Sequence, residues 1–251
     1  MDIIQFQMFE DNYGYLLRDG KTVAIDPGDA PATIAELEKR GWLLDEIWNT
    51  HHHWDHAGGN AELIKRYGCI VLAPAAEVSK IGAVDRTLKP GEQVKFGNST
   101  ADVIDVGGHT LGQIAYYFKA QHALFCGDAV FGLGCGRLFE GTHQQMWESL
   151  NRVIALPDDT LIYCAHEYLL SNVGFALSVE GENTALVDRI AAEKAKRAQA
   201  LPTVPMKLSM EKRTNPFLRP ADAGFMTRHF ASQTPESAFK QLRQKRDTWK
   251  S

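Results

Sequence analysis

Seven consecutive residues of the sequence, T-H-H-H-W-D-H at positions 50–56, place four candidate metal ligands within six positions. Imidazole and carboxylate groups are the ligand types that suit zinc and similar first-row metals. The preceding residues 45–49 are typical of a strand that runs into a loop, and side chains at a strand end alternate in direction. His51 and His53 are therefore expected to point the same way, and His52 the opposite way. The chain must fold so that this strand end presents its side chains to a metal.

The last two candidate ligands of the run, Asp55 and His56, follow after a turn and can face a second site, so the spacing predicts two ions rather than one. The alternative is a disordered His-rich tract or a tag remnant. Against it, the run is internal, follows an apolar strand and precedes the turn Gly58-Gly59, behind which a helix is expected over 60–67. We interpret the run as a metal site. His52 is the one histidine of the run that we do not expect to bind the metal.

Length, composition and net charge indicate a globular protein. A chain of 251 residues can bury a large core, as one large domain or as one domain with an appendage. Its 44% hydrophobic and 23% charged residues are ordinary for a globular protein. A net charge of −4 gives no global attraction to nucleic acid or to an anionic membrane surface, so neither is expected as a partner. The N-terminus lacks the features of a signal peptide, and no apolar stretch approaches transmembrane length.

The cysteines are dispersed and form no C-x-x-C pair. This usage predicts buried thiols in a reducing cytoplasm, and argues against a disulfide framework or a thiolate zinc site. The four residues are Cys69, Cys126, Cys135 and Cys164.

Short strand signals dominate the first two-thirds of the chain, with helical signals between them. The expected strands span residues 22–25, 69–72, 94–96, 101–106, 114–118, 123–126 and 161–164. Helices are expected over 31–39 and 144–156, and Gly97-Asn98 is typical of a hairpin turn. This mixture predicts an α/β protein with strands stacked between helices.

The pattern changes after Tyr168. Residues 183–200 and 236–250 are typical of long helices, and four prolines mark an irregular connection between them. No strand pattern of comparable strength recurs there. We therefore expect a second, mostly helical region from about Glu167 onward.

Three further candidate ligands lie in inter-strand loops or just beyond strands. His109 lies in the Gly-bracketed loop G-G-H-T-L-G, Asp128 ends the apolar stretch L-F-C-G-D, and His166 ends I-Y-C-A-H. Each signal is weak alone, because loop histidines and Gly-Asp turns are common. Together they gain force, because α/β folds gather strand ends along one edge and place their sites there.

These motifs resemble the metallo-β-lactamase-fold hydrolases, and within them the glyoxalase II (hydroxyacylglutathione hydrolase) family. The metal motifs carry the resemblance to the superfamily. The remaining motifs resemble glyoxalase II over nearly the whole chain. They are D-N-Y at 11–13, I-D-P-G at 25–28, G-C-G-R-L-F-E-G at 134–141, H-E-Y at 166–168, N-P-F at 215–217 and the basic stretch around Arg243 and Arg246.

The resemblance implies a four-layer αββα sandwich over residues 1–166, which binds the metals, followed by a helical substrate-binding domain over 167–251. It also implies two divalent ions, with zinc favoured and iron or manganese as alternatives. A hydroxide between the ions would attack the substrate, and Asp55 would orient it. Asp26 would support the ligands, although a carboxylate in a turn is nearly as good an interpretation. The implied ligands are His51, His53 and His109 for one ion, Asp55, His56 and His166 for the other, and Asp128 between them.

The resemblance further implies that glutathione is bound by Arg137, Phe139, Tyr168, Arg243 and Arg246. Arg243 and Arg246 are three apart on an expected helix and so share a face. From charge alone, that helix would be a solvated surface. The chain also departs from the family, which carries Lys, Tyr and Lys at the positions of Arg137, Phe139 and Arg246. Phe139 lacks a hydroxyl, so one polar contact is expected to be missing.

The implied reaction is hydrolysis of S-2-hydroxyacylglutathione, such as S-D-lactoylglutathione, to glutathione and a 2-hydroxy acid, in methylglyoxal detoxification. A small-molecule thioester is thus the expected partner of a monomeric, cytoplasmic enzyme. Rivals on the same scaffold are a β-lactamase, a nuclease of RNA ends and an iron persulfide dioxygenase. A missing export signal, the acidic net charge and the full ligand set, respectively, argue against them. A non-catalytic protein that binds metal or glutathione conjugates is a further alternative.

Overall fold

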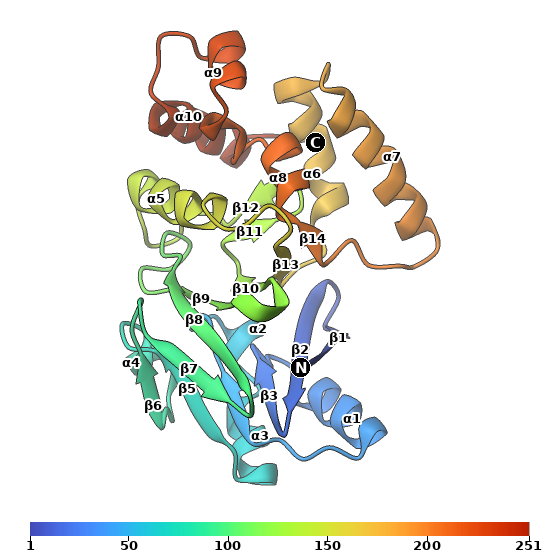
Figure 1. The fold of residues 1–251 in the computed structure, drawn as a ribbon, viewed down its shortest axis with the longest axis vertical. Coiled ribbons are helices and arrows are strands. Elements are labelled where there is room, and N and C mark those ends of the chain that lie inside the picture. Colours follow the sequence, from blue (N-terminus) through green and yellow to red (C-terminus); the bar gives the residue numbers. More distant parts are fainter. Residues whose placement is uncertain (251) are drawn as a thin grey trace. The chain divides into compact units, whose positions relative to one another are not determined.

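The protein is described here by a computed structural model covering residues 1–250. Its contacts divide the chain into two compact units. Unit 1 comprises Met1–Val106 and Thr110–Gly127, and unit 2 comprises Gly107–His109 and Asp128 onward (Figure 1). The chain therefore passes between the units on either side of His109 and again before Asp128. Among residues 1–250, no helix is both long enough and apolar enough to span a membrane.

The first sheet of unit 1 has six strands in sequence order. The first three pair antiparallel and the last three join in parallel. Parallel pairing of the third and fourth strands sets Ile25 opposite Trp48, so the residues that follow each strand share one edge of the sheet. The strands are β1 (Asp2–Met8), β2 (Asn12–Asp19), β3 (Lys21–Ile25), β4 (Glu46–Trp48), β5 (Ile70–Pro74) and β6 (Arg86–Leu88).

Four more strands of unit 1 form an antiparallel array in the order β10-β9-β8-β7. They are β7 (Gln93–Phe96), β8 (Ser99–Asp105), β9 (Ile114–Phe118) and β10 (Ala123–Gly127). The array packs on the first sheet through buried aromatic rings. Trp48 of β4 lies 5.6 Å from Phe96 and 5.1 Å from Tyr116 between ring centroids. Such ring pairs add about 1 kcal/mol each beyond the area they bury.

Helices α1 (Ala30–Arg40) and α3 (Asn60–Tyr67) cover the other side of the first sheet. Their buried residues, including Leu37 and Leu63, form one core cluster with strand residues such as Ile47. Asp29 caps α1 by accepting a hydrogen bond from the backbone N–H of Ala32 at 3.1 Å. Unit 1 also holds α2 (Trp54–Ala57), α4 (Val78–Ile81) and the 3-10 turn η1 (Lys119–Gln121). The predicted stacking of strands and helices is confirmed.

Unit 2 is mostly helical. Its helices are α5 (His143–Ile154), α6 (Leu169–Glu180), α7 (Thr184–Ala198), α8 (Leu208–Thr214), η2 (Arg219–Ala221), α9 (Ala223–His229) and α10 (Pro235–Asp247). Its short strands are β11 (Val130–Phe131), β12 (Gly134–Cys135), β13 (Leu161–Cys164) and β14 (Met206–Lys207). One core cluster joins α6 to α7, and Trp147 of α5 stacks on Phe239 of α10 at 5.7 Å.

Most predicted elements agree with the structure to within a few residues. Strand 161–164 and helix 60–67 have the predicted bounds, and Gly97-Asn98 is the turn of the β7–β8 hairpin. All four cysteines are free and buried, as expected. The sequence did not predict strands β1, β2, β6, β11 and β12 or helices α2, α4, α6, α8 and α9, and β14 adds a two-residue strand to the region predicted to lack strands. The predicted domain boundary at residue 166 stays a prediction.

Candidate metal centre and substrate pocket

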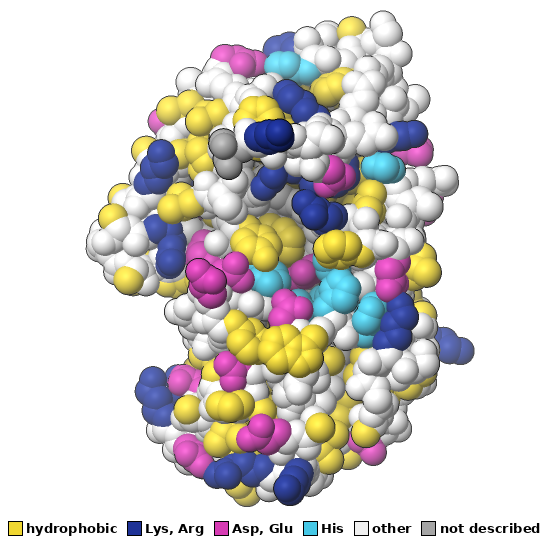
Figure 2. Space-filling model, turned by 180° about the vertical axis from the view of Figure 1, so that it is seen from behind, with side chains coloured by type: hydrophobic (Ala, Val, Ile, Leu, Met, Phe, Trp, Pro, Cys, Tyr) yellow, Lys and Arg dark blue, Asp and Glu magenta, His cyan; other side chains and the backbone are white. Residues whose placement is uncertain are grey.

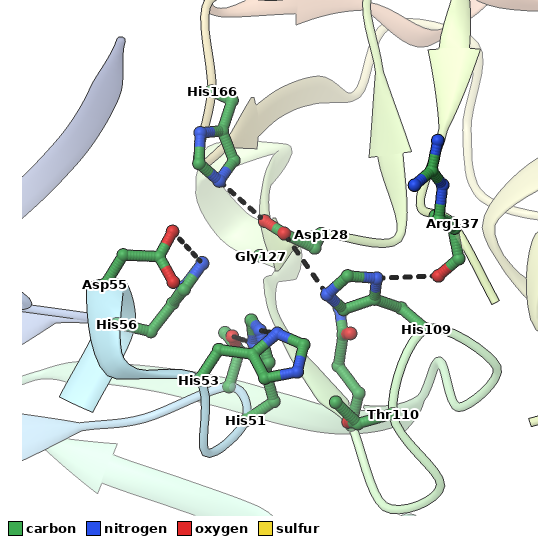
Figure 3. A network of polar contacts seen from close by, with 12 residues as sticks. His51, His53, Asp55, His56, His109, Thr110, Gly127, Asp128, Arg137 and His166 are labelled. Atoms are coloured by element: carbon green, nitrogen blue, oxygen red, sulfur yellow. Dashed lines mark hydrogen bonds and ion pairs between the residues drawn. The ribbon is translucent and has the colours of Figure 1, made fainter. Parts of the chain in front are cut away.

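Unit 1 supplies His51 and His53 from the loop after β4, and Asp55 and His56 from helix α2. Nε2 of His51 lies 3.1 Å from Nδ1 of His53, and Nε2 of His56 lies 3.6 Å from Oδ2 of Asp55 (Figure 3). Two ligands on one tetrahedral zinc, each about 2.0–2.2 Å from the ion, lie roughly 3.3 Å apart. These spacings therefore suit pairs of ligands that share an ion.

Asp26, directly after β3, fixes the orientation of two of these histidines. Its Oδ2 lies 3.0 Å from Nδ1 of His56 and also accepts a hydrogen bond from the Thr50 hydroxyl at 2.6 Å. The carboxylate can only accept, so Nδ1 of His56 donates. The Thr50 oxygen, having given its proton to Asp26, accepts from Nδ1 of His51 at 3.0 Å. Both imidazoles thus keep their lone pair on Nε2, the atom that faces the other candidate ligands.

The β3 loop approaches α2 closely enough to require a glycine. A Cβ at Gly28 would lie 1.9 Å from the backbone oxygen of Asp55. No larger residue fits without moving this backbone. The I-D-P-G motif therefore supplies Asp26 and also sets the position of residues 51–56, which we call the ligand loop.

His52 contacts Glu77 in the turn before α4, and its ring centroid lies 4.9 Å from that of His53. Its Nδ1 lies 2.7 Å from Oε2 of Glu77, and its backbone N–H donates to the same oxygen at 2.8 Å. The other oxygen, Oε1, accepts from the Thr110 hydroxyl and from the backbone N–H of Gly112 at 2.9 Å. Glu77, which is 2% exposed, therefore joins the ligand loop to the residues that follow His109.

Asn12, the first residue of β2, donates from Nδ2 to Oδ2 of Asp55 at 2.9 Å. Asn12 is buried and the Asp55 side chain is one third exposed, and the bond between them orients the Asp55 carboxylate.

Unit 2 contributes a second group of ligand-type side chains around Asp128. Oδ2 of Asp128 lies 3.3 Å from Nε2 of His109, and Oδ1 lies 3.5 Å from Nε2 of His166 (Figure 3). Each carboxylate oxygen thus faces a different imidazole. This is the arrangement needed for a carboxylate that serves two ions at once.

The contacts of His109 make this group suitable for a cation. Its Nδ1 lies 2.8 Å from the backbone oxygen of Arg137, which can only accept, so Nδ1 carries the proton. In the neutral ring, the Nε2 lone pair then points at a carboxylate oxygen of Asp128. Two acceptors that face each other at this distance repel unless a cation lies between them. The donor set, imidazole nitrogens with carboxylate oxygens, suits zinc, iron or manganese.

A cavity of about 280 Å³ in unit 2 joins these ligands to the predicted substrate residues. Its lining includes His109 and Asp128. It also includes all five residues expected to bind substrate, namely Arg137, Phe139, Tyr168, Arg243 and Arg246. The Tyr168 ring stacks on His166 at 4.6 Å, and the exposed Phe139 ring lies 5.2 Å from His109.

Positive charge accumulates in this cavity. Burial, and then the neighbouring charges of Arg243 and Arg137, lower the pKa of Arg246. The guanidinium of Arg246 lies 5.9 Å from the centre of the Phe175 ring, and Nη2 lies 3.4 Å from the Asn172 side-chain oxygen. An anionic ligand would relieve the mutual repulsion of these cations.

Arg243 is buried and bonded to other residues of unit 2, which the amino-acid sequence did not predict. It is 5% exposed and donates from Nη1 to the backbone oxygen of Cys135 at 3.2 Å and from Nη2 to Asp247 at 2.7 Å. Cys135 is itself buried, and its burial raises the pKa of its thiol. Arg243 therefore links α10 to β12 in addition to lining the cavity.

The structure groups every predicted ligand with at least one other inside its own unit. Glu77 and Asn12 were not predicted to serve the site. Asn12 had a signal in the D-N-Y motif, but nothing in the sequence around Glu77 marks it, because its partners lie 25 to 35 positions away.

The comparisons with known proteins cover almost the whole chain. Residues 10–166 match the family model of the metallo-beta-lactamase superfamily, and residues 167–249 match the model of the hydroxyacylglutathione hydrolase C-terminus. All seven candidate ligands fall within the first match.

Two curated relatives are named hydroxyacylglutathione hydrolase. The protein from Hyphomonas neptunium is 53% identical over 222 residues, which is 87% of each chain. The protein from Methylococcus capsulatus is 44% identical over 254 residues, which covers 100% of this chain and 99% of the relative. Among solved structures, ETHE1 from Myxococcus xanthus has a TM-score of 0.71 at 23% identity, covering 100% of this chain and 93% of that one. The last likeness concerns the fold alone, and it confirms the predicted metallo-β-lactamase-like sandwich.

Proposed function

Because this chain belongs to the metallo-beta-lactamase superfamily, and within it to the hydroxyacylglutathione hydrolase family, we propose that it hydrolyses the thioester of S-2-hydroxyacylglutathione. S-D-Lactoylglutathione, which would yield glutathione and D-lactate in methylglyoxal detoxification, is the substrate we favour. One observation carries the proposal beyond family membership. A single cavity of unit 2 is lined both by ligand-type residues and by three arginines, whose positive charge suits an anionic peptide such as glutathione.

We assign two divalent ions to the seven ligand-type residues. His51, His53 and His109 would hold one ion, and Asp55, His56 and His166 the other, with Asp128 serving both. The support is the inward-facing lone pairs of His51 and His56 and the two-sided contact of Asp128. When bound, two such ions supply Lewis-acid activation of a carbonyl and a water acidified toward a pKa of about 7. Zinc is our first choice, and iron or manganese would suit the same ligands.

The remaining steps fall to the residues of the chain. Asp55, held by Asn12, would orient the attacking water. Asp128 would contribute one ligand to each of the two ions. Attack on the thioester carbonyl forms a C–O bond and breaks the C–S bond, with glutathione leaving as thiolate. A thiol pKa of about 8.5 lets it leave without a strong general acid, which an amide nitrogen would require. No further acid is needed in the cavity.

Glutathione recognition is assigned to the cations of the cavity and to Tyr168. Arg137 and Arg246 would meet glutathione carboxylates, while the Tyr168 hydroxyl would offer a hydrogen bond. Arg243, already engaged by Cys135 and Asp247, would act mainly by shaping this surface. Phe139 cannot supply a hydroxyl contact, so the affinity for the glutathione moiety should depend more on the arginines.

One experiment tests the proposal against its rivals. Metal content per chain is measured together with turnover of S-D-lactoylglutathione, nitrocefin and a phosphodiester. We expect about two metals per chain and turnover of the thioester alone. Nitrocefin hydrolysis would indicate a lactamase, phosphodiester cleavage a nuclease, and a metal-loaded protein without any turnover a binding protein.

The proposal includes a cytoplasmic, monomeric protein whose catalytic domain ends at His166 and whose substrate domain begins at Glu167. Four buried free thiols suit a reducing compartment. Fractionation of cells, light scattering and limited proteolysis around residues 166–167 would test these three points separately.

A further inference from the structure

Trp54 is exposed in a place where an indole has no role in the reaction assigned so far. It is 69% exposed, and among residues 1–250 it is the only one of the five tryptophans in the exposed class. It lies on α2 directly between the proposed ligands His53 and Asp55. Leaving a large ring in water forgoes about 2 kcal/mol of burial, so such a ring at a ligand loop calls for a function.

A second exposed ring accompanies it. Phe9, 40% exposed at the β1–β2 turn, lies 5.0 Å from Trp54 between ring centroids, with the planes inclined by 32°. We call these two side chains the aromatic platform. Exposed hydrophobic side chains are visible beside histidines in Figure 2.

The backbone next to each ring of the aromatic platform has an unusual local geometry. Phe9 has a φ of 46°, a left-handed conformation that a bulky residue rarely adopts, and Gln7 closes the turn by donating to the backbone oxygen of Glu10 at 3.0 Å. On the other side, a Cβ at Gly58 would lie 2.7 Å from Nε1 of Trp54, so the indole lies against a bare backbone. Such strain tends to be kept where a side chain must be presented for function.

We propose that the aromatic platform binds the acyl side chain of the thioester and adds affinity for aromatic or branched apolar acyl groups. This inference rests on the proposed thioester hydrolysis. The scissile carbonyl has glutathione on its sulfur side, for which the residues of unit 2 are assigned. The acyl side needs other groups near the ligands, and Trp54 adjoins the proposed ligands His53 and Asp55 in the chain. A phenyl or branched alkyl group would cover the two rings, whereas the methyl group of a lactoyl unit would cover little of them.

The test compares S-D-mandeloylglutathione with S-D-lactoylglutathione for the wild type, Trp54→Ala and Phe9→Ala. We expect the ratio of kcat/KM for mandeloyl over lactoyl to fall about tenfold in Trp54→Ala and about threefold in Phe9→Ala, the range of a lost aromatic contact. The matched control is Leu43→Ala, an equally exposed apolar residue of unit 1 at 74%, which should leave the ratio unchanged. An unchanged ratio in Trp54→Ala would overturn the proposal.

A binding measurement separates failure of the platform from failure of the proposed function. S-Benzylglutathione and S-methylglutathione cannot be hydrolysed as thioesters, and their Kd values are compared by calorimetry. We expect Trp54→Ala to lose the preference for the benzyl compound by about tenfold. If the wild type hydrolyses no thioester, the proposed function fails. If it hydrolyses both but shows no Trp54-dependent preference in either assay, only the platform fails.

A separate observation concerns Glu77, and we infer that it is a positioning residue for the metal ligands. Its four contacts come from two segments that each adjoin a ligand. His52 lies between His51 and His53, and Thr110 directly follows His109. A buried carboxylate with every contact to ligand-bearing segments fixes ligand orientation before any metal arrives.

Glu77→Gln tests this inference, because the amide keeps the shape but turns one acceptor oxygen into a donor that faces an N–H or hydroxyl donor. We expect zinc affinity, measured by competition with a chromogenic chelator, to fall by about 10- to 100-fold, and the absorption spectrum of the cobalt form to change. Glu62→Gln, an exposed carboxylate of α3, is the matched control.

Should Glu77→Gln fail to fold, Thr110→Val removes a single contact of the same carboxylate and keeps the side-chain volume. It should lower zinc affinity by several-fold and shift the cobalt spectrum in the same direction. Wild-type affinity and spectrum in a folded Glu77→Gln, together with a lowered melting temperature, would leave Glu77 with a purely structural role.

Discussion

Oδ2 of Asp26 lies 3.0 Å from Nδ1 of His56, and the same carboxylate controls His51 through the Thr50 hydroxyl. Asp26 itself has a φ of 49°, a strained backbone for a residue other than glycine. One buried carboxylate therefore sets the tautomer of two proposed ligands of unit 1.

Asp26→Asn should lower zinc affinity by about 10- to 100-fold. Asparagine tolerates the left-handed backbone, so the fold is kept, but its amide nitrogen competes as a donor for His56 or Thr50. Chelator competition measures the change. Asp102→Asn, a half-buried carboxylate of β8, should leave affinity unchanged, and equal losses in both variants would contradict the role of Asp26.

Asp128→Asn should reduce the metal content and abolish most of kcat. Its two oxygens face His109 and His166 separately, and an amide can offer a lone pair to only one of them. Metal analysis by mass spectrometry should therefore give one ion per chain or fewer where the wild type has about two. A variant that keeps both metal content and rate would refute the assignment of Asp128 to both ions.

The sequence predicted the metal residues well because they lie in short runs at strand ends, where alternation and turn chemistry act over a few positions. Glu77 could not be predicted in this way, since its role arises only when the turn after β5 meets two distant loops. Helix α6 was missed for a different reason. Its exposed face carries Leu170 and Leu177, each 39% exposed, so it lacks the polar stripe that reveals an amphipathic helix.

Substitutions of Arg243 and Arg246 should differ in their effect on the melting temperature, although both residues lie on α10. Arg246→Ala removes a half-buried cation of the cavity and should mainly raise KM, by about tenfold, with little change in melting temperature. Arg243→Ala should raise KM and also lower the melting temperature, because it leaves Asp247 and the Cys135 carbonyl without their buried donor. Steady-state kinetics and thermal unfolding of both variants measure the difference. Equal melting temperatures would contradict the structural role of Arg243.

The pair Glu180 and Arg219 predicts how unit 2 responds to acid. Burial alone would raise the pKa of Glu180, but hydrogen bonds from Arg219, Asn183 and Arg228 outweigh it and hold the pKa below its usual range. Arg219 binds the carboxylate through Nε at 2.8 Å and Nη2 at 2.9 Å, which joins α6 to η2. A carboxylate with a lowered pKa in the folded state stabilises the fold above its unfolded pKa of about 4.3, and this contribution is lost as the pH falls through the folded pKa.

Arg219→Met should therefore destabilise the protein by about 3 kcal/mol at pH 7, because it leaves a buried carboxylate without its main partner. The difference from the wild type should shrink as the pH falls below about 4.3, the unfolded pKa, and is lost only once the pH has passed through the lowered folded pKa of Glu180. Urea unfolding at pH 7 and at pH 3 measures the two differences. Adding Glu180→Gln to Arg219→Met should recover part of the loss at pH 7, since the buried negative charge that has lost its main partner is then removed. A difference that stays constant with pH would show that packing of the Arg219 side chain, rather than its charge, stabilises this part of unit 2.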